Sequence, residues 1–331
     1  MDRQFTNEAF VARIEPEYNA FMKRAETVRW SPATIDYSKI DHSKLTINDL
    51  FGVFVTLHIE NYSDVYTKLL VEEYGDVPLI KDFVLNWERE EENHARVFEK
   101  YMISLGIPLD ELRANYAKVN KDDFPVPTRD QAGLNVFVFL QELFTREMYI
   151  KILKATKEPV LTEILKRVVR DEERHYRFYK FTLGLRLEMD KKNTLKQMRN
   201  VMRIFGMPQT MYRQRAMTDK LMEYYSFNWA EIMSIARPIM KTLEASPSRL
   251  FTKLPRLQAA WQNRRTFTYA LQTPYLWNHV AVGIKHALGF NLVPANDRKY
   301  VDDTVARLEK LLTPQSTSDN VLRFKTAKQM Y

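Results

Sequence analysis

The sequence contains no cysteine. This excludes disulfides, iron–sulfur clusters, thiolate zinc sites and cysteine nucleophiles. Glycine is also scarce, with eight residues in 331, and no G-x-G-x-x-G or G-x-x-x-x-G-K segment occurs. Nothing in the sequence therefore supports a glycine-rich loop that binds a dinucleotide or a phosphate. Few glycines and only 14 prolines favour long, uninterrupted helices.

Long hydrophobic runs are missing as well. The longest, such as "VFVFL" at 136–140, are too short to cross a bilayer. The N-terminus, "MDRQFTNEAF", lacks the layout of a signal peptide, so we expect a cytoplasmic protein. A net charge of +8 favours acidic partners in general. No nucleic-acid-binding motif is present, and we expect no nucleic-acid partner.

Four segments have the apolar spacing of long helices, and no stretch alternates regularly enough to predict a sheet. They cover about 46–73, 77–105, 128–157 and 158–187. The links between the first and second and between the third and fourth segments are short, which predicts antiparallel neighbours. The middle link is longer and contains Pro125 and Pro127. This pattern predicts an all-α four-helix bundle with one long crossover.

Additional C-terminal helices are expected near 194–204, 215–242, 252–287 and 299–312. The segment "GIPLDE" at 106–111 is expected to be a turn. We therefore predict three parts: an N-terminal lead-in segment over 1–45, a helical bundle with its following helices over 46–235, and a helical extension over 236–331. The extension is expected to pack on the bundle and to end in a polar tail.

Two E-x-x-H motifs stand on the second and fourth predicted helices, Glu91 to His94 and Glu172 to His175. Residues three apart lie on one helix face, so each motif directs a carboxylate and an imidazole to one point. Glu60 precedes Glu91 by 31 residues, and Glu142 precedes Glu172 by 30. Four glutamates and two histidines from four helices form the ligand set of a carboxylate-bridged di-iron site. Oxygen and imidazole donors without sulfur suit iron or manganese better than structural zinc.

The helix faces support this interpretation, since on the last three helices these residues lie on the apolar stripe. A charge there must be paired or bound to metal. Around Glu60 the stripe is weaker. Glu147 is an alternative to Glu142, but it lies about 140° away around the helix. Each motif taken alone is also compatible with acids on the solvated face of an amphipathic helix.

Several segments resemble the soluble acyl-carrier-protein desaturases, which are ferritin-like di-iron enzymes. The resemblance covers about 25–230. The segments are "RWSP" at 29–32, "NWEREEENHARVFEKYM", "FLQELFT", "RDEERH" and "FGMPQTMY" at 205–212. Two features depart from the plant enzymes: Glu92 and Asn93 stand where those have an asparagine and an arginine, and the tail after about 265 is unlike theirs.

The resemblance implies roles for individual residues. Two iron ions (Fe2+/Fe3+) would be bound by six side chains: Glu60, Glu91, His94, Glu142, Glu172 and His175. Asp171 would accept a hydrogen bond from a ligand histidine. Thr145 would lie at the oxygen-binding face and help to deliver protons, or its hydroxyl would simply bond its own helix. Trp30 would belong to an electron-transfer path, or be a plain core aromatic.

The activity implied is O2-dependent desaturation of an acyl chain held as a thioester, with acyl carrier protein and a ferredoxin-like electron donor as partners. A homodimer is implied, and the plastid stroma is the alternative location if a transit peptide has been removed. "VFVFL", Met148 and Tyr149 are candidate walls of an acyl channel. The alternative function is a di-iron hydroxylase or N-oxygenase of a specialised metabolite pathway, and an iron-storage or structural bundle is a third reading.

Three related di-iron families fit less well. Arylamine N-oxygenases add a histidine where Val168 stands. Ribonucleotide reductase small subunits usually carry a radical tyrosine where Phe98 stands. Ferritins are usually shorter than this chain.

Overall fold

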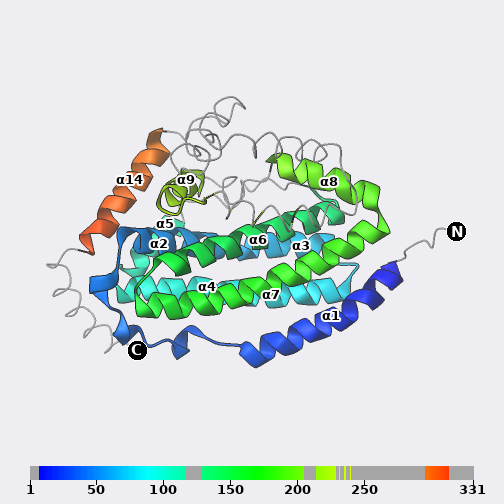
Figure 1. The fold of residues 1–331 in the computed structure, drawn as a ribbon, viewed down its shortest axis with the longest axis horizontal. Helices are drawn as coiled ribbons and strands as arrows, with labels where there is room; N and C mark the ends of the chain where they lie inside the picture. Colours follow the sequence, from blue (N-terminus) through cyan, green and yellow to red (C-terminus); the bar gives the residue numbers. More distant parts are fainter. Residues whose placement is uncertain are drawn as a thin grey trace, which may run out of the picture. The chain divides into compact units, whose positions relative to one another are not determined.

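A computed structural model of the chain describes residues 7–116, 128–204, 214–228, 231, 235, 239 and 295–312 (Figure 1). The chain divides into two compact units, one of residues 1–221 with 297–331 and one of residues 222–296. In the second unit, Asn228 and Glu231 exchange backbone-to-side-chain hydrogen bonds of 2.8 and 3.0 Å. The described residues form helices and no strand, which confirms the all-α class.

The first unit contains the predicted four-helix bundle. Its first position is shared by α2 (Ile47–Glu60) and α3 (Ser63–Glu73), and the others are α4 (Pro78–Ser104), α6 (Gln131–Ala155) and α7 (Pro159–Met189). The helices α2 and α3 pack on α4, and α6 packs on α7 (Figure 1). The crossover runs from α4 to α6 and carries α5 (Leu109–Tyr116). The ferritin-like arrangement with one long crossover is confirmed.

The predicted helix over 46–73 is wrong in one respect, because it is interrupted at Asn61 and Tyr62. The Tyr62 N–H donates to the Ile59 carbonyl three residues back at 3.1 Å, and the Val65 N–H donates to the Tyr62 carbonyl. These tight turns end α2 at Glu60 and start α3 at Ser63. The interruption at Asn61 and Tyr62 explains why the apolar stripe of the predicted helix is weaker around Glu60.

Other segments also differ from expectation. The lead-in segment contains a long helix, α1 (Asn7–Val28), and three short 3-10 turns, Pro32–Thr34, Tyr37–Lys39 and His42–Lys44. The expected turn at 106–111 gives way at Leu109 to α5, whose first turn carries Asp110 and Glu111, as suits a helix N-terminus.

The C-terminal helix predictions are met in part. The helices α8 (Lys191–Ile204), α9 (Gln214–Tyr224) and α14 (Ala295–Lys310) lie near predicted ones. The predicted helix over 252–287, the polar tail and "FGMPQTMY" lie outside the described residues, as do Pro125 and Pro127. The three-part division at 45 and 235 stays a prediction.

The start of α7 is fixed by a buried carboxylate. Glu158 is fully buried and caps the helix by accepting from the N–H groups of Val160 at 3.1 Å and Leu161 at 2.6 Å. It also accepts from the Asp41 N–H at 3.0 Å and from the Tyr101 hydroxyl at 2.8 Å. Because Tyr101 belongs to α4, this cap ties α7 to α4, the two helices that carry the E-x-x-H motifs. In the described part of the chain, no helix is long and apolar enough to cross a membrane.

Candidate metal centre

The bundle brings the six predicted ligand side chains together. Glu60 comes from the last residue of α2, and α6 supplies Glu142. The helices α4 and α7 each supply one E-x-x-H pair. None of the six is more than 5% exposed. A set of acids and histidines this deeply buried needs charge partners or metal ions.

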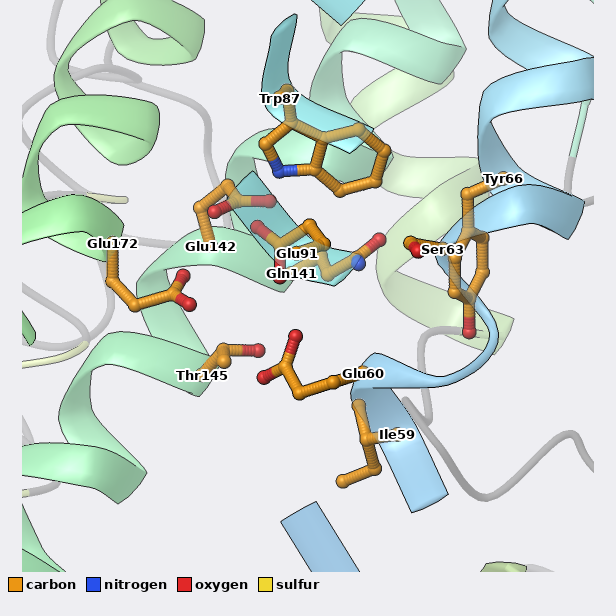
Figure 2. Close-up of a pocket in the computed structure, with 10 residues that line it drawn as sticks. All are labelled: Ile59, Glu60, Ser63, Tyr66, Trp87, Glu91, Gln141, Glu142, Thr145 and Glu172. Carbon is orange, nitrogen blue, oxygen red and sulfur yellow. The ribbon is translucent and has the colours of Figure 1, made fainter. Parts of the chain in front are cut away.

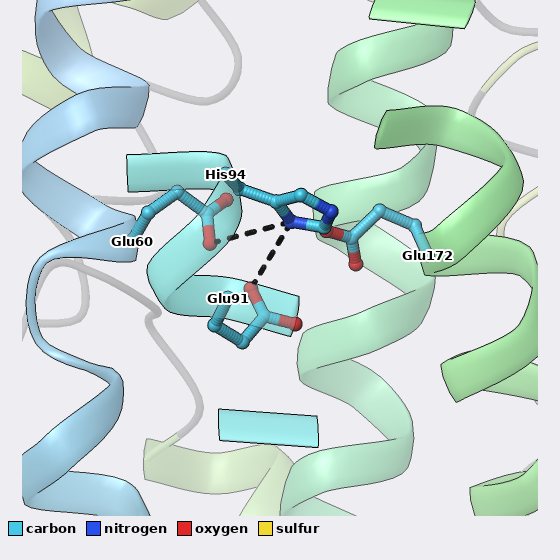
Figure 3. A group of neighbouring side chains, drawn as sticks. All are labelled: Glu60, Glu91, His94 and Glu172. Carbon is cyan, nitrogen blue, oxygen red and sulfur yellow. Dashed lines mark ion pairs between the residues drawn. The ribbon is translucent and has the colours of Figure 1, made fainter. Parts of the chain in front are cut away.

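The six residues form two overlapping groups, in each of which one ligand atom per residue lies within 4.8 Å of the others. One group is Glu60, Glu91, His94 and Glu172 (Figure 3). The other is Glu91, Glu142, Glu172 and His175. Because Glu91 and Glu172 belong to both groups, the arrangement suits two ions bridged by two carboxylates.

Distances from the histidines define the geometry. His94 Nδ1 lies 3.3 Å from Glu172 Oε1, 3.5 Å from Glu91 Oε2 and 3.9 Å from Glu60 Oε2. His175 Nδ1 lies 3.1 Å from Glu91 Oε1, 3.5 Å from Glu142 Oε2 and 3.9 Å from Glu172 Oε2. Both imidazoles thus turn Nδ1 toward the shared carboxylates.

The donor set passes a test of fit for metal ions. Five of its buried atoms have no hydrogen-bond partner among the described residues: Glu91 Oε1, His94 Nδ1, Glu142 Oε2, Glu172 Oε1 and His175 Nδ1. A buried polar atom without a partner costs about 1–3 kcal/mol, and a coordinated ion would satisfy it. Four carboxylates and two imidazoles without sulfur fit iron or manganese.

Crowding of the carboxylates supports the same conclusion. Burial, followed by the charge of Glu91, raises the pKa of Glu60 well above its usual value. Burial also raises the pKa of Glu142 well above its usual value, with a contribution from the charge of Glu172 and a smaller opposing effect of nearby His175. Cations placed between these groups would offset both the repulsion and the loss of solvation.

The outer nitrogen of each histidine faces an acid on the opposite helix. His94 Nε2 lies 3.3 Å from Asp171 Oδ2, and His175 Nε2 lies 2.6 Å from Glu90 Oε2. Arg174 donates to Asp171 at 2.6 Å and to Glu90 at 3.0 Å, and so joins the two pairs. Asp171 was predicted from the sequence, whereas Glu90 was missed. The available signal was its position, since each acid stands one residue before a ligand glutamate.

These contacts shift the pKa values of the groups involved. Burial lowers the pKa of His94, but the neighbouring acids Asp171, Glu172 and Glu91 outweigh it and hold that pKa well above its usual value. Burial raises the pKa of Asp171, but the hydrogen bond and charge of His94 and the charge of Arg174 lower it to about 2. Asp171 is therefore an anion at neutral pH and a permanent acceptor for His94.

Trp30 lies at the outer end of this network. Its indole N–H donates to Asp171 Oδ2 at 2.7 Å, and its ring stacks on His94 with centroids 6.3 Å apart and planes at 22°. The half-buried ring is therefore in contact with both members of the Asp171–His94 pair. Trp30 is therefore more than an aromatic residue that only fills the core, because it contacts both Asp171 and His94.

A small cavity of about 10 Å³ adjoins the carboxylates, room for about one water molecule. Thr145, predicted for the oxygen-binding face, lines it together with Glu60 and Glu142 (Figure 2). The complete lining of this inner cavity is Ile59, Glu60, Ser63, Tyr66, Trp87, Glu91, Gln141, Glu142, Thr145 and Glu172. The predicted channel residues Val136–Leu140, Met148 and Tyr149 do not line it.

Two further residues of α6 have distinct positions. Tyr149 is buried and its hydroxyl donates to Glu60 Oε1, so it supports a ligand residue. Glu147, the alternative to Glu142, pairs with Arg146 and belongs to neither group. The structure therefore places Glu142, and not Glu147, among the six.

Comparisons with known proteins agree with the motif resemblance. Residues 73–233 match the family model described as fatty acid desaturase. Among solved structures, an R2-like ligand-binding oxidase from Sulfolobus acidocaldarius is 14% identical, with 69% of this chain and 89% of that one covered and a TM-score of 0.48. Another R2-like ligand-binding oxidase, described with a Mn/Mn cofactor, is 15% identical over 70% of this chain and 91% of its own, with a TM-score of 0.49.

No curated protein sequence matches the chain. The family model covers α4, α6 and α7, and therefore every predicted ligand except Glu60. Fatty acid desaturases are oxidoreductases, and the described residues include buried carboxylate and histidine groups of the kind that binds metal ions. The match over residues 73–233 makes this part of the chain similar to the fatty acid desaturase family.

Proposed function

We propose that the chain is an O2-dependent di-iron desaturase that introduces a double bond into an acyl chain held as a thioester on acyl carrier protein. The observation that carries the proposal is the pair of overlapping groups that share Glu91 and Glu172. The family match over 73–233 supports an acyl substrate.

The six residues divide between two metal positions. Glu60 and His94 would hold one iron, Glu142 and His175 the other, and Glu91 and Glu172 both. Two bound irons would supply the reduction of O2 and the removal of hydrogen from an unactivated CH2 group. The protein contributes the positions of the ligands, the exclusion of water and the supply of protons and electrons.

The outer hydrogen bonds keep both imidazoles in one tautomer. With Nε2–H directed to Asp171 or Glu90, Nδ1 is the nitrogen that would lose its proton and present a lone pair to a metal ion. Asp171 is hydrogen-bonded to both Trp30 and His94. These three residues would form the path by which electrons from a ferredoxin-like donor reach the metal centre. Arg174 balances the charge of the two outer acids.

Thr145 and the inner cavity would manage protons. The Thr145 hydroxyl lines the cavity with Glu60, Glu142 and Glu172, within the space where O2 would be reduced (Figure 2). Because the cavity has room for about one water, little water would stand beside these carboxylates. A hydroxyl at this position can donate a proton and then take up another from a water molecule in the cavity.

The charge balance is consistent with the proposed partners. An acyl carrier protein is acidic, and the net charge of +8 would steer such a partner toward this chain. We propose a homodimer on the family resemblance alone.

Product analysis tests the proposal. Acyl-carrier-protein thioesters of several chain lengths are incubated with the iron-loaded chain, ferredoxin, its reductase and O2, and products are examined by mass spectrometry. We expect one thioester to lose two hydrogens and two iron ions to be bound per chain. Products that gain an oxygen atom would favour the hydroxylase instead, and absence of any iron-dependent product would refute an acyl-thioester oxidase. Glu142→Ala serves as the control for metal-dependent turnover.

A further inference from the structure

A second, larger cavity lies outside the metal centre, between the α2–α3 interruption and α4. Its volume is about 310 Å³. The residues that line this outer cavity are Leu57, Glu60, Asn61, Ser63, Asp64, Glu92, Ala95, Arg96 and Glu99. The proposed desaturase chemistry uses none of them except Glu60.

The lining of the outer cavity is acidic. Asp64 and Glu92 are exposed, Glu99 is half-buried and Glu60 lies at the inner end. Arg96 is the one cation among the lining residues described, and Glu92 pairs with it at 2.7 Å. Burial, with the charges of Glu92 and Asp64, raises the pKa of nearby Glu88, which indicates a negative potential at this surface. Such a surface concentrates cations.

The outer and inner cavities share two lining residues at the helix interruption. Glu60 and Ser63 line both, and they are the last residue of α2 and the first of α3. Glu60 is also a member of the group that contains Glu91, His94 and Glu172. One carboxylate therefore lies at the junction of a solvent-facing acidic cavity and a buried set of ligand atoms without hydrogen-bond partners.

We propose that the outer cavity is the route by which divalent cations reach the metal centre. A cation with about six waters, at about 30 Å³ each, fits the outer cavity but not the inner one. Glu60 would replace part of the hydration shell and pass the cation to Glu91, His94 and Glu172. This inference rests on the proposed two-metal function and concerns how the ions arrive.

Metal uptake by the metal-free chain tests the route. Co(II) is mixed anaerobically with the full-length protein, and the growth of its ligand-field absorption is followed by stopped flow. We expect the Asp64→Asn/Glu99→Gln double variant to take up Co(II) at least about threefold more slowly, and Arg96→Gln to take it up faster. All should reach the same final metal content, because no varied residue is among the six ligands.

A matched control removes the same charge elsewhere. Glu163→Gln/Glu188→Gln changes two exposed acids of α7 that line neither cavity, and should leave the uptake rate unchanged. Equal slowing by both double variants, or no slowing by the first, would overturn the route while two-metal binding stands. A wild-type chain that binds no Co(II) would overturn the proposed function and the route with it. Higher salt should slow the wild type more than Asp64→Asn/Glu99→Gln.

Discussion

At the scale of single residues, two acids outside the ligand set control how its histidines are presented. Asp171 of α7 faces His94 of α4, and Glu90 of α4 faces His175 of α7. Each acid directly precedes a ligand glutamate in the sequence. A helix rotates about 100° per residue, so neighbours point to different sides of the helix, and one helix can supply both a ligand and the acceptor for a histidine of its partner.

The choice of Glu142 as a ligand can be tested directly. Glu142→Ala removes a carboxylate that belongs to one of the two groups, and we expect it to abolish tight iron binding. Iron is counted by elemental analysis after anaerobic loading and desalting. Glu147→Ala, on the same helix, is the control and should keep its iron, because Glu147 pairs with Arg146 instead. Unchanged iron content in Glu142→Ala would refute the ligand assignment.

Glu90 gives a second prediction at this scale. Glu90→Gln keeps the size of the side chain but weakens the acceptor at His175 Nε2, and it leaves Arg174 with less charge to balance. Substitutions at such positions typically weaken metal affinity about 10–100-fold. Competition with a chelator measures the affinity, and Asp171→Asn should behave similarly through His94. A Glu90→Gln chain with wild-type affinity would mean that Glu90 does not support the ligand.

At the scale of helices, the interruption of α2 and α3 is the feature that the sequence pattern did not predict. Apolar spacing extends over 46–73 with a weaker stripe around Glu60, and spacing alone cannot reveal a local change from i→i−4 to i→i−3 bonding. The same pattern correctly predicted the long helices α4, α6 and α7 because their stripes are regular. The helix α5 was missed because eight residues next to a proline read as a turn.

The cap of α7 offers a prediction for stability. Glu158→Ala leaves the donors of Val160, Leu161, Asp41 and Tyr101 without their buried acceptor. We expect the free energy of unfolding to fall by about 2–4 kcal/mol. Urea denaturation measures the change. Glu163→Ala, at an exposed site on the same helix, should stay within about 0.5 kcal/mol of wild type. Equal urea midpoints for Glu158→Ala and Glu163→Ala would mean that the Glu158 cap does not stabilise the fold.

At the scale of the whole molecule, metal binding should stabilise the fold. The ligands come from four helices, so the unfolded chain has no such site and only the folded state gains from binding. Metal at about 100 times its dissociation constant adds about 2.7 kcal/mol. For a chain of this size we expect the Tm to rise by about 4 °C. Calorimetry with and without chelator measures the shift, which Glu142→Ala should lack.

Metal binding should also release protons. Burial and neighbouring carboxylates raise the pKa values of Glu60 and Glu142, so in the metal-free chain both keep their protons to higher pH than ordinary glutamates do. Ligands must lose these protons to bind a cation, so metal affinity should fall as the pH is lowered. Titration calorimetry in buffers of different ionisation enthalpy counts the protons. Equal heats in all buffers would contradict this.

The sequence by itself determined the class of fold and predicted the six candidate ligands that the structure brings together. Glu91 with His94, and Glu172 with His175, share a helix face because of the helical repeat, which is a local property. Only the tertiary structure decided that Asp171 serves His94, that Glu90 serves His175, and that Glu60 belongs both to the lining of the acidic cavity and to the candidate metal centre. The two histidine contacts join residues 77 and 85 positions apart, and they exist only because α4 packs against α7.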